Sequence, residues 1–297
     1  MATIFGRSVT RATRNEQAIL FVLAIAIGLA AAYGAVGFVL AVDFVHTIGF
    51  GVRSHAFLTA AAGISPWRVV AVPVLGGLAI GVFLHATIKG GRVHGLAHVI
   101  EANAINRGRL STRSAFASAI GSAASIGVGA STGREGPVIH LAAWMGAWLA
   151  KRLQLGQSLS RTLLGCGAAA AVGALFNAPI AGVFFALEVV IGGYALRSFA
   201  PVVVSAVTAT VIGRIHFGAE PAFDVPTSHI LSLWEFPAFA LLGVVAAAAA
   251  IAFMHAIFVS AKVAETTRLP GWARPAVGGL VVGVMALYLP QILGVGY

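Results

Sequence analysis

A carboxylate and a guanidinium stand side by side between glycines in the run Gly133-Arg134-Glu135-Gly136-Pro137. The surrounding sequence is strongly apolar, and an ionisable group at membrane depth is costly unless it is paired or serves an ion path. Glycines allow tight bends that leave backbone N–H groups free, and proline suits the first turn of a helix. We therefore expect an extended turn over 133–137 and a helix that starts near Pro137. Such a helix start is a candidate anion site with a titratable group, Glu135, built into it.

Two imidazoles and a carboxylate share a helical spacing earlier in the chain. His94, His98 and Glu101 stand at positions i, i+4 and i+7, so they would lie on one helix face. Two histidines and a carboxylate can bind zinc, but no fourth ligand is evident. The alternative is a polar face at the membrane interface, and we predict neither a metal site nor a cofactor.

Acidic residues are rare, which makes each of them informative. Seven of the nine lie near expected helix ends, at the interface or in loops: Glu16, Asp43, Glu101, Glu220, Asp224, Glu235 and Glu265. The other two are Glu135 and Glu188. Glu135 could pair with Arg134, although adjacent side chains on a helix do not face each other well. Glu188 could instead be a helix-end carboxylate bound by backbone or by Arg197.

Composition places these residues in a membrane protein. Of 297 residues, 59% are hydrophobic and 9% charged, whereas a soluble domain carries about 25% charged residues. The net charge of +10 does not indicate nucleic acid, because the basic residues fall at expected helix ends and in short loops. Cys166 is the only cysteine, and no nucleophile–base set is evident, so the sequence does not predict an enzyme.

The expected elements are all helices. Apolar stretches long enough to cross a membrane run over 17–46, 68–87, 198–215, 232–261 and 274–290. Between them, residues 114–190 hold shorter apolar pieces broken by Gly, Ser, Asn and Pro, which indicates helices that meet in mid-membrane.

Basic residues also predict the orientation. They concentrate before the first span and in the connection 88–113, whereas the connection 47–67 holds only Arg53. Two crossings separate the basic ends, so both should face the cytoplasm of a bacterial-type inner membrane, with the N-terminus inside.

A second motif follows the first at a fixed distance. Residues 176–179 read Phe-Asn-Ala-Pro and open an Ala-Gly-containing helix that runs to Glu188, with Asn177 placed to cap it. Gly-Arg-Glu-Gly-Pro followed some forty residues later by this motif resembles the CLC family of chloride channels and proton-coupled chloride exchangers. The resemblance extends from about residue 17 to the end.

The resemblance implies a homodimer in the lipid bilayer, with one pore per subunit and two inverted halves. Residues 1–215 would form the first half, and 216–297 the opening helices of the second. The family's Gly-x-Phe-x-Pro loop and pore tyrosine are not found, and Tyr297 is no obvious match. We therefore expect a truncated second half, as in the N-terminal fragment of a longer protein.

The resemblance also implies residue roles. Glu135 matches the family's gate, with Gly133, Arg134, Gly136 and Pro137 as its loop. The family's first pore loop, usually Gly-Ser-Gly-Ile-Pro, matches 93–97, so His94 replaces the chloride-contacting serine and Gly95 follows it. Both would line the inner end of the anion path.

Besides His94, a second residue departs from the family pattern, and it concerns proton coupling. Exchangers usually carry a glutamate directly after the position of Glu188, and that position is Val189. Valine cannot relay a proton, and the side chain of Glu188 should point about 100° away on a helix. We therefore expect channel-like or uncoupled chloride transport gated by Glu135. The alternatives are a proton-coupled antiporter with another proton route and an inactive or truncated membrane scaffold.

Overall fold

The computed structural model describes residues 2–52, 64–106, 108–219 and 232–294, with side chains from residue 17 onward. The described residues form helices and no strand, which confirms the all-α prediction. The long helices are α1 (Ala2–Phe50), α3 (Pro66–Thr87), α7 (Gln157–Phe176), α9 (Leu196–Phe217) and α10 (Glu235–Thr266). The shorter elements are α4 (Leu96–Ala104), α5 (Thr112–Gly127), α6 (Glu135–Arg152), α8 (Pro179–Phe185), the π-helical turn η3 (Ala186–Ile191), α11 (Arg274–Ala286) and the 3-10 turn η4 (Pro290–Ile292).

The chain divides into two compact units. One comprises Met1–Ala222 with Gly271–Tyr297, and the other comprises Phe223–Pro270 and contains α10. Every residue considered below for the candidate site lies in the first unit.

The five membrane-spanning candidates differ in part from those expected. Four of them, Gln17–Phe50, Pro66–Thr87, Leu196–Phe217 and Glu235–Thr266, confirm predicted spans. The fifth is Gln157–Phe176, a continuous 20-residue helix inside the region expected to hold only short pieces. Its many small residues are compatible with an unbroken helix, because alanine is the strongest helix former. The predicted span 274–290 is wrong, because α11 ends at Ala286 after 13 residues.

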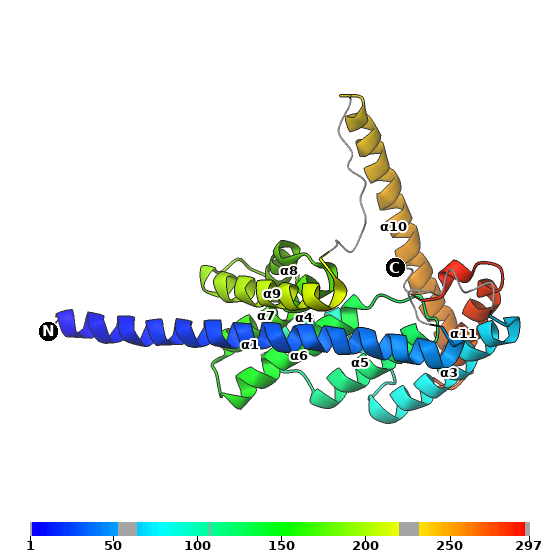
Figure 1. Ribbon diagram of the computed structural model, residues 1–297, viewed down its shortest axis with the longest axis horizontal. Coiled ribbons are helices and arrows are strands. Elements are labelled where there is room, and N and C mark those ends of the chain that lie inside the picture. Colours follow the sequence, from blue (N-terminus) through cyan, green and yellow to red (C-terminus); the bar gives the residue numbers. More distant parts are fainter. Residues whose placement is uncertain (1, 53–63, 107, 220–231, 295–297) are drawn as a thin grey trace. The chain divides into compact units, whose positions relative to one another are not determined.

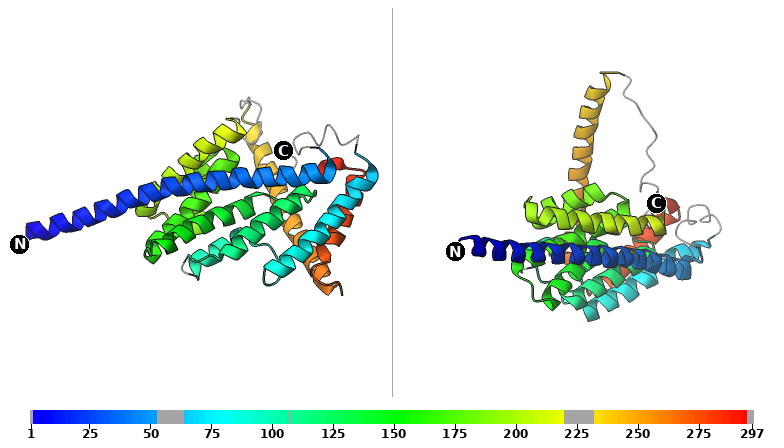
Figure 2. Two further views of the ribbon diagram at one scale, coloured as in Figure 1. Left: turned by 60° about the horizontal axis from the view of Figure 1, so that its bottom comes forward. Right: turned by 60° about the vertical axis from the view of Figure 1, so that its left-hand side comes forward.

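Helices of the first unit lie side by side in a row, with α1 across them. Successive neighbours in contact are α11, α3, α5, α6, α7 and α9, and α1 packs against α3, α5, α6, α7 and α9 (Figure 1). Figure 2 shows α1 running over α3, α5 and α6 from two further directions. The short helices α4 and α8 fill positions beside α6 and α7.

Glycines allow the close helix contacts in this row. On α3 and α11, Gly77 and Gly81 meet the backbone of 272–276, and Gly279 and Gly283 meet the backbone of 69–74. A β-carbon at Gly81 or Gly279 would overlap a carbonyl oxygen of the facing segment. Each helix thus presents a small-xxx-small pair, the pattern that lets helices approach in lipid.

Candidate functional site

The starts of α4 and α6 meet. A β-carbon on Gly95 would lie 3.8 Å from Gly136 Cα, and one on Gly136 would lie 3.9 Å from Gly95 Cα. Neither helix start has a side-chain cap; Gly95 precedes α4, and Arg134 precedes α6. Two positive helix ends therefore converge on one small region with no side chain between Gly95 and Gly136.

The α6 start differs from the sequence-based expectation. The helix begins at Glu135, two residues before Pro137, and Arg134 already has helical dihedral angles of −79° and −12°. The prediction of an extended turn over all of 133–137 was therefore wrong for 134–137. Pro137 occupies the third helical position, where its missing N–H has no intrahelical partner to lose.

The Glu135 carboxylate folds back over Gly133. A β-carbon at Gly133 would overlap Glu135 Oε2, so only glycine leaves room for this arrangement. The Glu135 side chain is half-buried, whereas Gly133 is exposed. The carboxylate thus sits at the N-terminus of its own helix, where the helix dipole favours a negative charge.

His94 is held by two serines of α5. Its backbone N–H donates to Ser118 Oγ at 2.8 Å, and its ring nitrogen Nδ1 shares a hydrogen bond with Ser114 Oγ. Burial lowers the pKa of His94, neighbouring His98 lowers it further, and Glu101 opposes the shift. The ring is therefore biased toward its neutral form, in which one nitrogen donates and the other accepts.

Three imidazoles gather beside the two helix starts. The rings of His94 and His98 stack at 3.7 Å between centroids, and the ring of His140 lies 6.0 Å from His94 and 6.4 Å from His98. His140 comes from α6, is 1% exposed, and its Nδ1 has no hydrogen-bond partner among the described residues. The sequence predicted that His94, His98 and Glu101 share one helix face. That prediction was wrong for His94, which precedes α4. Within the described ranges, no three potential ligands are placed to hold a metal.

Sequence reasoning missed His140, Ser114 and Ser118. The two serines stand four residues apart on α5, which is a usable signal for one helix face. His140 follows Glu135 by five residues and carries no spacing signal of its own.

Glu188 and Val189 lie in the π-helical turn η3, and both are exposed. The Tyr194 hydroxyl donates to Glu188 Oε2 at 3.3 Å, where Arg197 or backbone was the expected partner. Asn103, buried near the end of α4, donates its side-chain amide to the carbonyls of Val190 at 2.7 Å and Ile191 at 3.4 Å. The η3 turn, which contains the predicted internal proton-site position, is thus tied to the same short helix that begins at Gly95.

Asn177 does not cap the following helix. It ends α7 in the left-handed conformation with φ of 54°, and Ala178 precedes α8 without a side-chain cap. The Asn177 amide donates to Ala219 O at 2.7 Å, and Arg214 Nε donates to Asn177 Oδ1 at 2.6 Å. The expected N-cap role was wrong, because asparagine tolerates the left-handed conformation that closes the preceding helix.

Comparison with known proteins then decides the family. The family described as voltage gated chloride channel matches residues 76–297. The chain belongs to this family. The match includes both helix starts, the Gly-Arg-Glu-Gly-Pro run and the η3 turn.

Two curated relatives of this chain come from bacteria. A ClcB-like chloride channel protein from Ralstonia nicotianae is 37% identical over 245 residues, which cover 81% of this chain and 57% of the relative. The voltage-gated ClC-type chloride channel ClcB from Escherichia coli O139:H28 is 31% identical over 284 residues, which cover 93% of this chain and 66% of the relative. The chain thus spans between about half and two thirds of the length of these relatives.

Solved structures of the CLC type share the fold. A CLC-type fluoride/proton antiporter and a slow cyanobacterial Cl⁻/H⁺ antiporter each align with a TM-score of 0.75 at 22% identity. Each alignment covers 93% of this chain, and it covers 67% and 65% of the two structures respectively. The chain is therefore a multi-pass membrane protein with the helical arrangement of CLC proteins.

Proposed function

We propose that this chain forms the Glu135 side of a transmembrane chloride path in which the paired starts of α4 and α6 bind the anion. The supporting observation is the contact of Gly95 with Gly136, where two helix starts converge. Free N–H groups at both starts provide the hydrogen bonds that a dehydrated anion needs. Gly133, Arg134 and Pro137 shape the α6 start, and His94 lies beside the α4 start.

Glu135 is the gate in this proposal. Its carboxylate is an anion that already lies at the α6 start, so it competes with chloride for the same N–H groups. Protonation removes the negative charge and frees the site. Anion flux should therefore rise as the pH falls.

Substitution of Glu135 tests the gate. We expect Glu135→Gln to leave chloride efflux from liposomes intact or raised, and to remove most of its dependence on pH, because the amide carries no charge. Glu265→Gln is the matched control, since it neutralises an exposed carboxylate of α10, outside the candidate site, and should keep the pH dependence. Wild-type pH dependence in Glu135→Gln would count against the gating role.

Transport is uncoupled from protons in the favoured form of the proposal. Val189 offers neither a titratable group nor a hydrogen bond at the internal proton-site position. Glu188 next to it is exposed and bound by Tyr194. A chloride gradient should therefore not drive uphill proton movement.

The histidine cluster favours a second candidate, a proton-coupled antiporter. His94, His98 and His140 bring three titratable rings to the helix starts, and imidazole can pass a proton between its two nitrogens. This arrangement provides a proton route that bypasses Val189.

Proton movement in liposomes distinguishes the two candidates. A chloride gradient is imposed, and external pH is followed with a dye. The uncoupled form predicts no sustained proton uptake in the wild type. Proton pumping that collapses with an uncoupler and is lost in His140→Gln, but persists in the exposed-site variant His85→Gln, would establish the antiporter instead.

The remaining parts of the proposal concern assembly and placement. Two copies form a homodimer in a bacterial inner membrane, with the N-terminus in the cytoplasm, in accord with the basic connection 88–113. Residues 1–215 form the first inverted half, and 216–297 begin the second. The helix α10 presents an apolar surface with no buried residue, as expected of a segment that lipid or further protein covers.

A further inference from the structure

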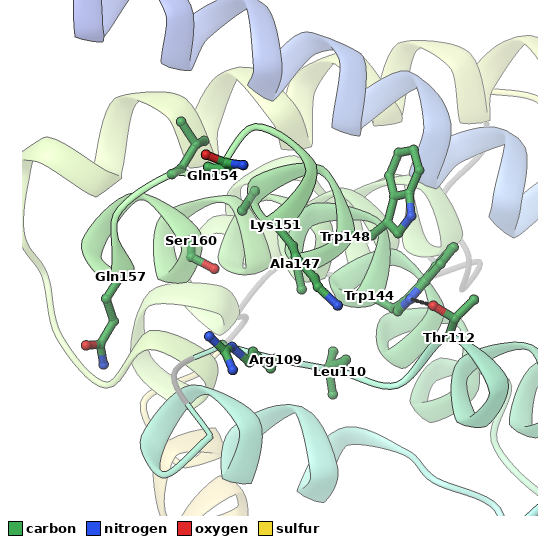
Figure 3. A pocket seen from close by; sticks show the side chains of 13 residues that line it. Arg109, Leu110, Thr112, Trp144, Ala147, Trp148, Lys151, Gln154, Gln157 and Ser160 are labelled. Atoms are coloured by element: carbon green, nitrogen blue, oxygen red, sulfur yellow. Dashed lines mark hydrogen bonds between the residues drawn. The ribbon is translucent and has the colours of Figure 1, made fainter.

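A second site candidate lies away from the anion path. A cavity of about 460 Å³ is bounded by the end of α6, the start of α7 and the segment 108–112. Its walls carry two cations, Arg109 and Lys151, and no carboxylate. Figure 3 shows their side chains coming from different walls, Lys151 from α6 and Arg109 from the segment before α5. This volume falls within the range of small-ligand pockets and far exceeds that of a chloride ion.

The polar groups around this cavity suit an anion with several oxygens. Within the described residues, the side chains of Arg109 and Lys151 make no hydrogen bond or ion pair, so both charges are available. Gln154, Gln157 and Ser160 add neutral hydrogen-bonding groups to the walls. The helix α7 begins at Gln157 without a side-chain cap, and Gln157 and Ser160 of its first turn line the cavity, so the positive end of α7 lies beside it.

Gln154 occupies an unusual backbone position at the cavity wall. It follows the end of α6 with φ of 52°, in the left-handed region that favours glycine. Glycine would close the helix more easily, but it would remove an amide side chain from the cavity.

Two tryptophans line the cavity, Trp144 and Trp148. Trp144 donates its ring N–H to Thr112 Oγ1 at 3.2 Å, and Trp148 is 43% exposed, with the Arg152 guanidinium 5.6 Å from its ring centroid. Tryptophan is enriched at the level of lipid headgroups. Basic pockets between membrane helices at this level are suited to phosphate headgroups.

We propose that this cavity binds a phosphate group, contributed by the headgroup of an anionic phospholipid of the adjoining leaflet. Arg109 offers a planar pair of donors to phosphate oxygens, and Lys151 adds a point charge. The α7 start and the neutral side chains complete the donor set. This site is independent of the proposed chloride path.

The simpler alternative is that Lys151 only complements the C-terminal end of α6. Cations in the last helical turn are stabilising on their own. That role requires neither Arg109 on the facing wall nor a cavity between the two charges, so it predicts no ligand.

Lipid titration of the purified protein tests the proposal. Thermal unfolding is followed in micelles of a maltoside detergent, which contains no phosphate, at fixed ionic strength, with added phosphatidylglycerol in one arm and added inorganic phosphate in the other. Arg109→Gln and Lys151→Gln are compared with the wild type, with charge-preserving Lys151→Arg, and with Lys89→Gln. Lys89 is exposed in the basic connection 88–113 and does not line the cavity, so it is the matched control.

Phosphatidylglycerol should raise the unfolding temperature of the wild type, Lys151→Arg and Lys89→Gln. Arg109→Gln and Lys151→Gln should each bind phosphatidylglycerol about tenfold more weakly. The reason is that losing one hydrogen bond to a charged group lowers an affinity by about a factor of ten. A shift produced by inorganic phosphate alone, with the same dependence on Arg109 and Lys151, would support the phosphate site but overturn its lipid source. No shift in either arm, or equal losses in Lys89→Gln and the pocket variants, would overturn the site itself.

Discussion

At the scale of single residues, Gly133 and Glu135 act as a pair. The carboxylate of Glu135 occupies the space that a β-carbon on Gly133 would need. The glycine therefore sets where the charge of the candidate gate lies, in addition to allowing the backbone to bend. Proximity in sequence indicated that both residues belong to one site, but only the folded-back side chain explains why residue 133 is glycine.

Gly133→Ala should displace the proposed gate while leaving its titratable group, the Glu135 carboxylate, unchanged. The added methyl group displaces the Glu135 carboxylate from the α6 start, so we expect chloride efflux at neutral pH to rise and its response to acidification to shrink. Gly156→Ala is the matched control, because a β-carbon there meets no atom within 4 Å. Efflux assays over a pH series provide the measurement, and unchanged profiles in Gly133→Ala would contradict the steric role.

The contact of His140 with His94 and His98 could not be predicted from the sequence. The positions of Glu135, Gly136 and Gly95 were predicted together, and the structure brings Gly95 and Gly136 into contact. His140 was not predicted, because its approach to His94 and His98 depends on how α4 packs against α6. No local pattern encodes that contact, since the residues stand more than forty positions apart.

At the scale of elements, the short helices and the glycine faces position the site. The helix α4 begins at the proposed anion site, and through Asn103 it binds the carbonyls of η3. A π-helical turn leaves backbone groups out of the regular ladder, and a buried amide that pairs with them contributes about 0.5–1.5 kcal/mol per hydrogen bond. One nine-residue helix thus links the Gly95 end to the Glu188–Val189 segment.

Adjacent glycines on α11 offer a matched test of helix packing. Gly279 faces the Pro73 carbonyl of α3, whereas a β-carbon at Gly278 meets no atom within 4 Å. Both substitutions with alanine gain the same helix propensity, about 1 kcal/mol. We expect Gly278→Ala to be neutral or stabilising.

Gly279→Ala, by contrast, should destabilise the protein by about 1–3 kcal/mol through overpacking. The measurement is the unfolding temperature of Gly278→Ala and of Gly279→Ala in the same detergent. Equal unfolding temperatures would show that α3 and α11 do not pack through this face.

Element boundaries were predictable where composition was uniform and less so where it was mixed. Four long apolar stretches were located correctly, because about 20 apolar residues suffice to cross a bilayer. The helix α7 was not predicted as a single span, because its glycines and serines are residues typical of helix breaks. Its alanines are strong helix formers, and the helix continues through those positions. The predicted span 274–290 was too long, because Leu287 and Leu289 are apolar yet lie beyond the end of α11.

At the scale of the whole molecule, we propose that the chain forms one side of an anion path. The chain covers 57% of the Ralstonia relative and 66% of the Escherichia relative. The family assignment agrees with the folded arrangement, because the Gly95 and Gly136 helix starts lie within the matched residues 76–297. Length and composition predicted a membrane protein, but only the two motifs at their spacing predicted its family.

Anomalous diffraction from crystals of the protein grown in bromide tests the central claim most directly, because bromide replaces chloride and reveals its own position. The account predicts an anomalous peak within hydrogen-bonding distance of the backbone N–H groups at the starts of α4 and α6. The peak should be stronger in Glu135→Gln than in the wild type, since the competing carboxylate is gone. Ordered crystals of both proteins without a peak at the Gly95–Gly136 contact would contradict the account.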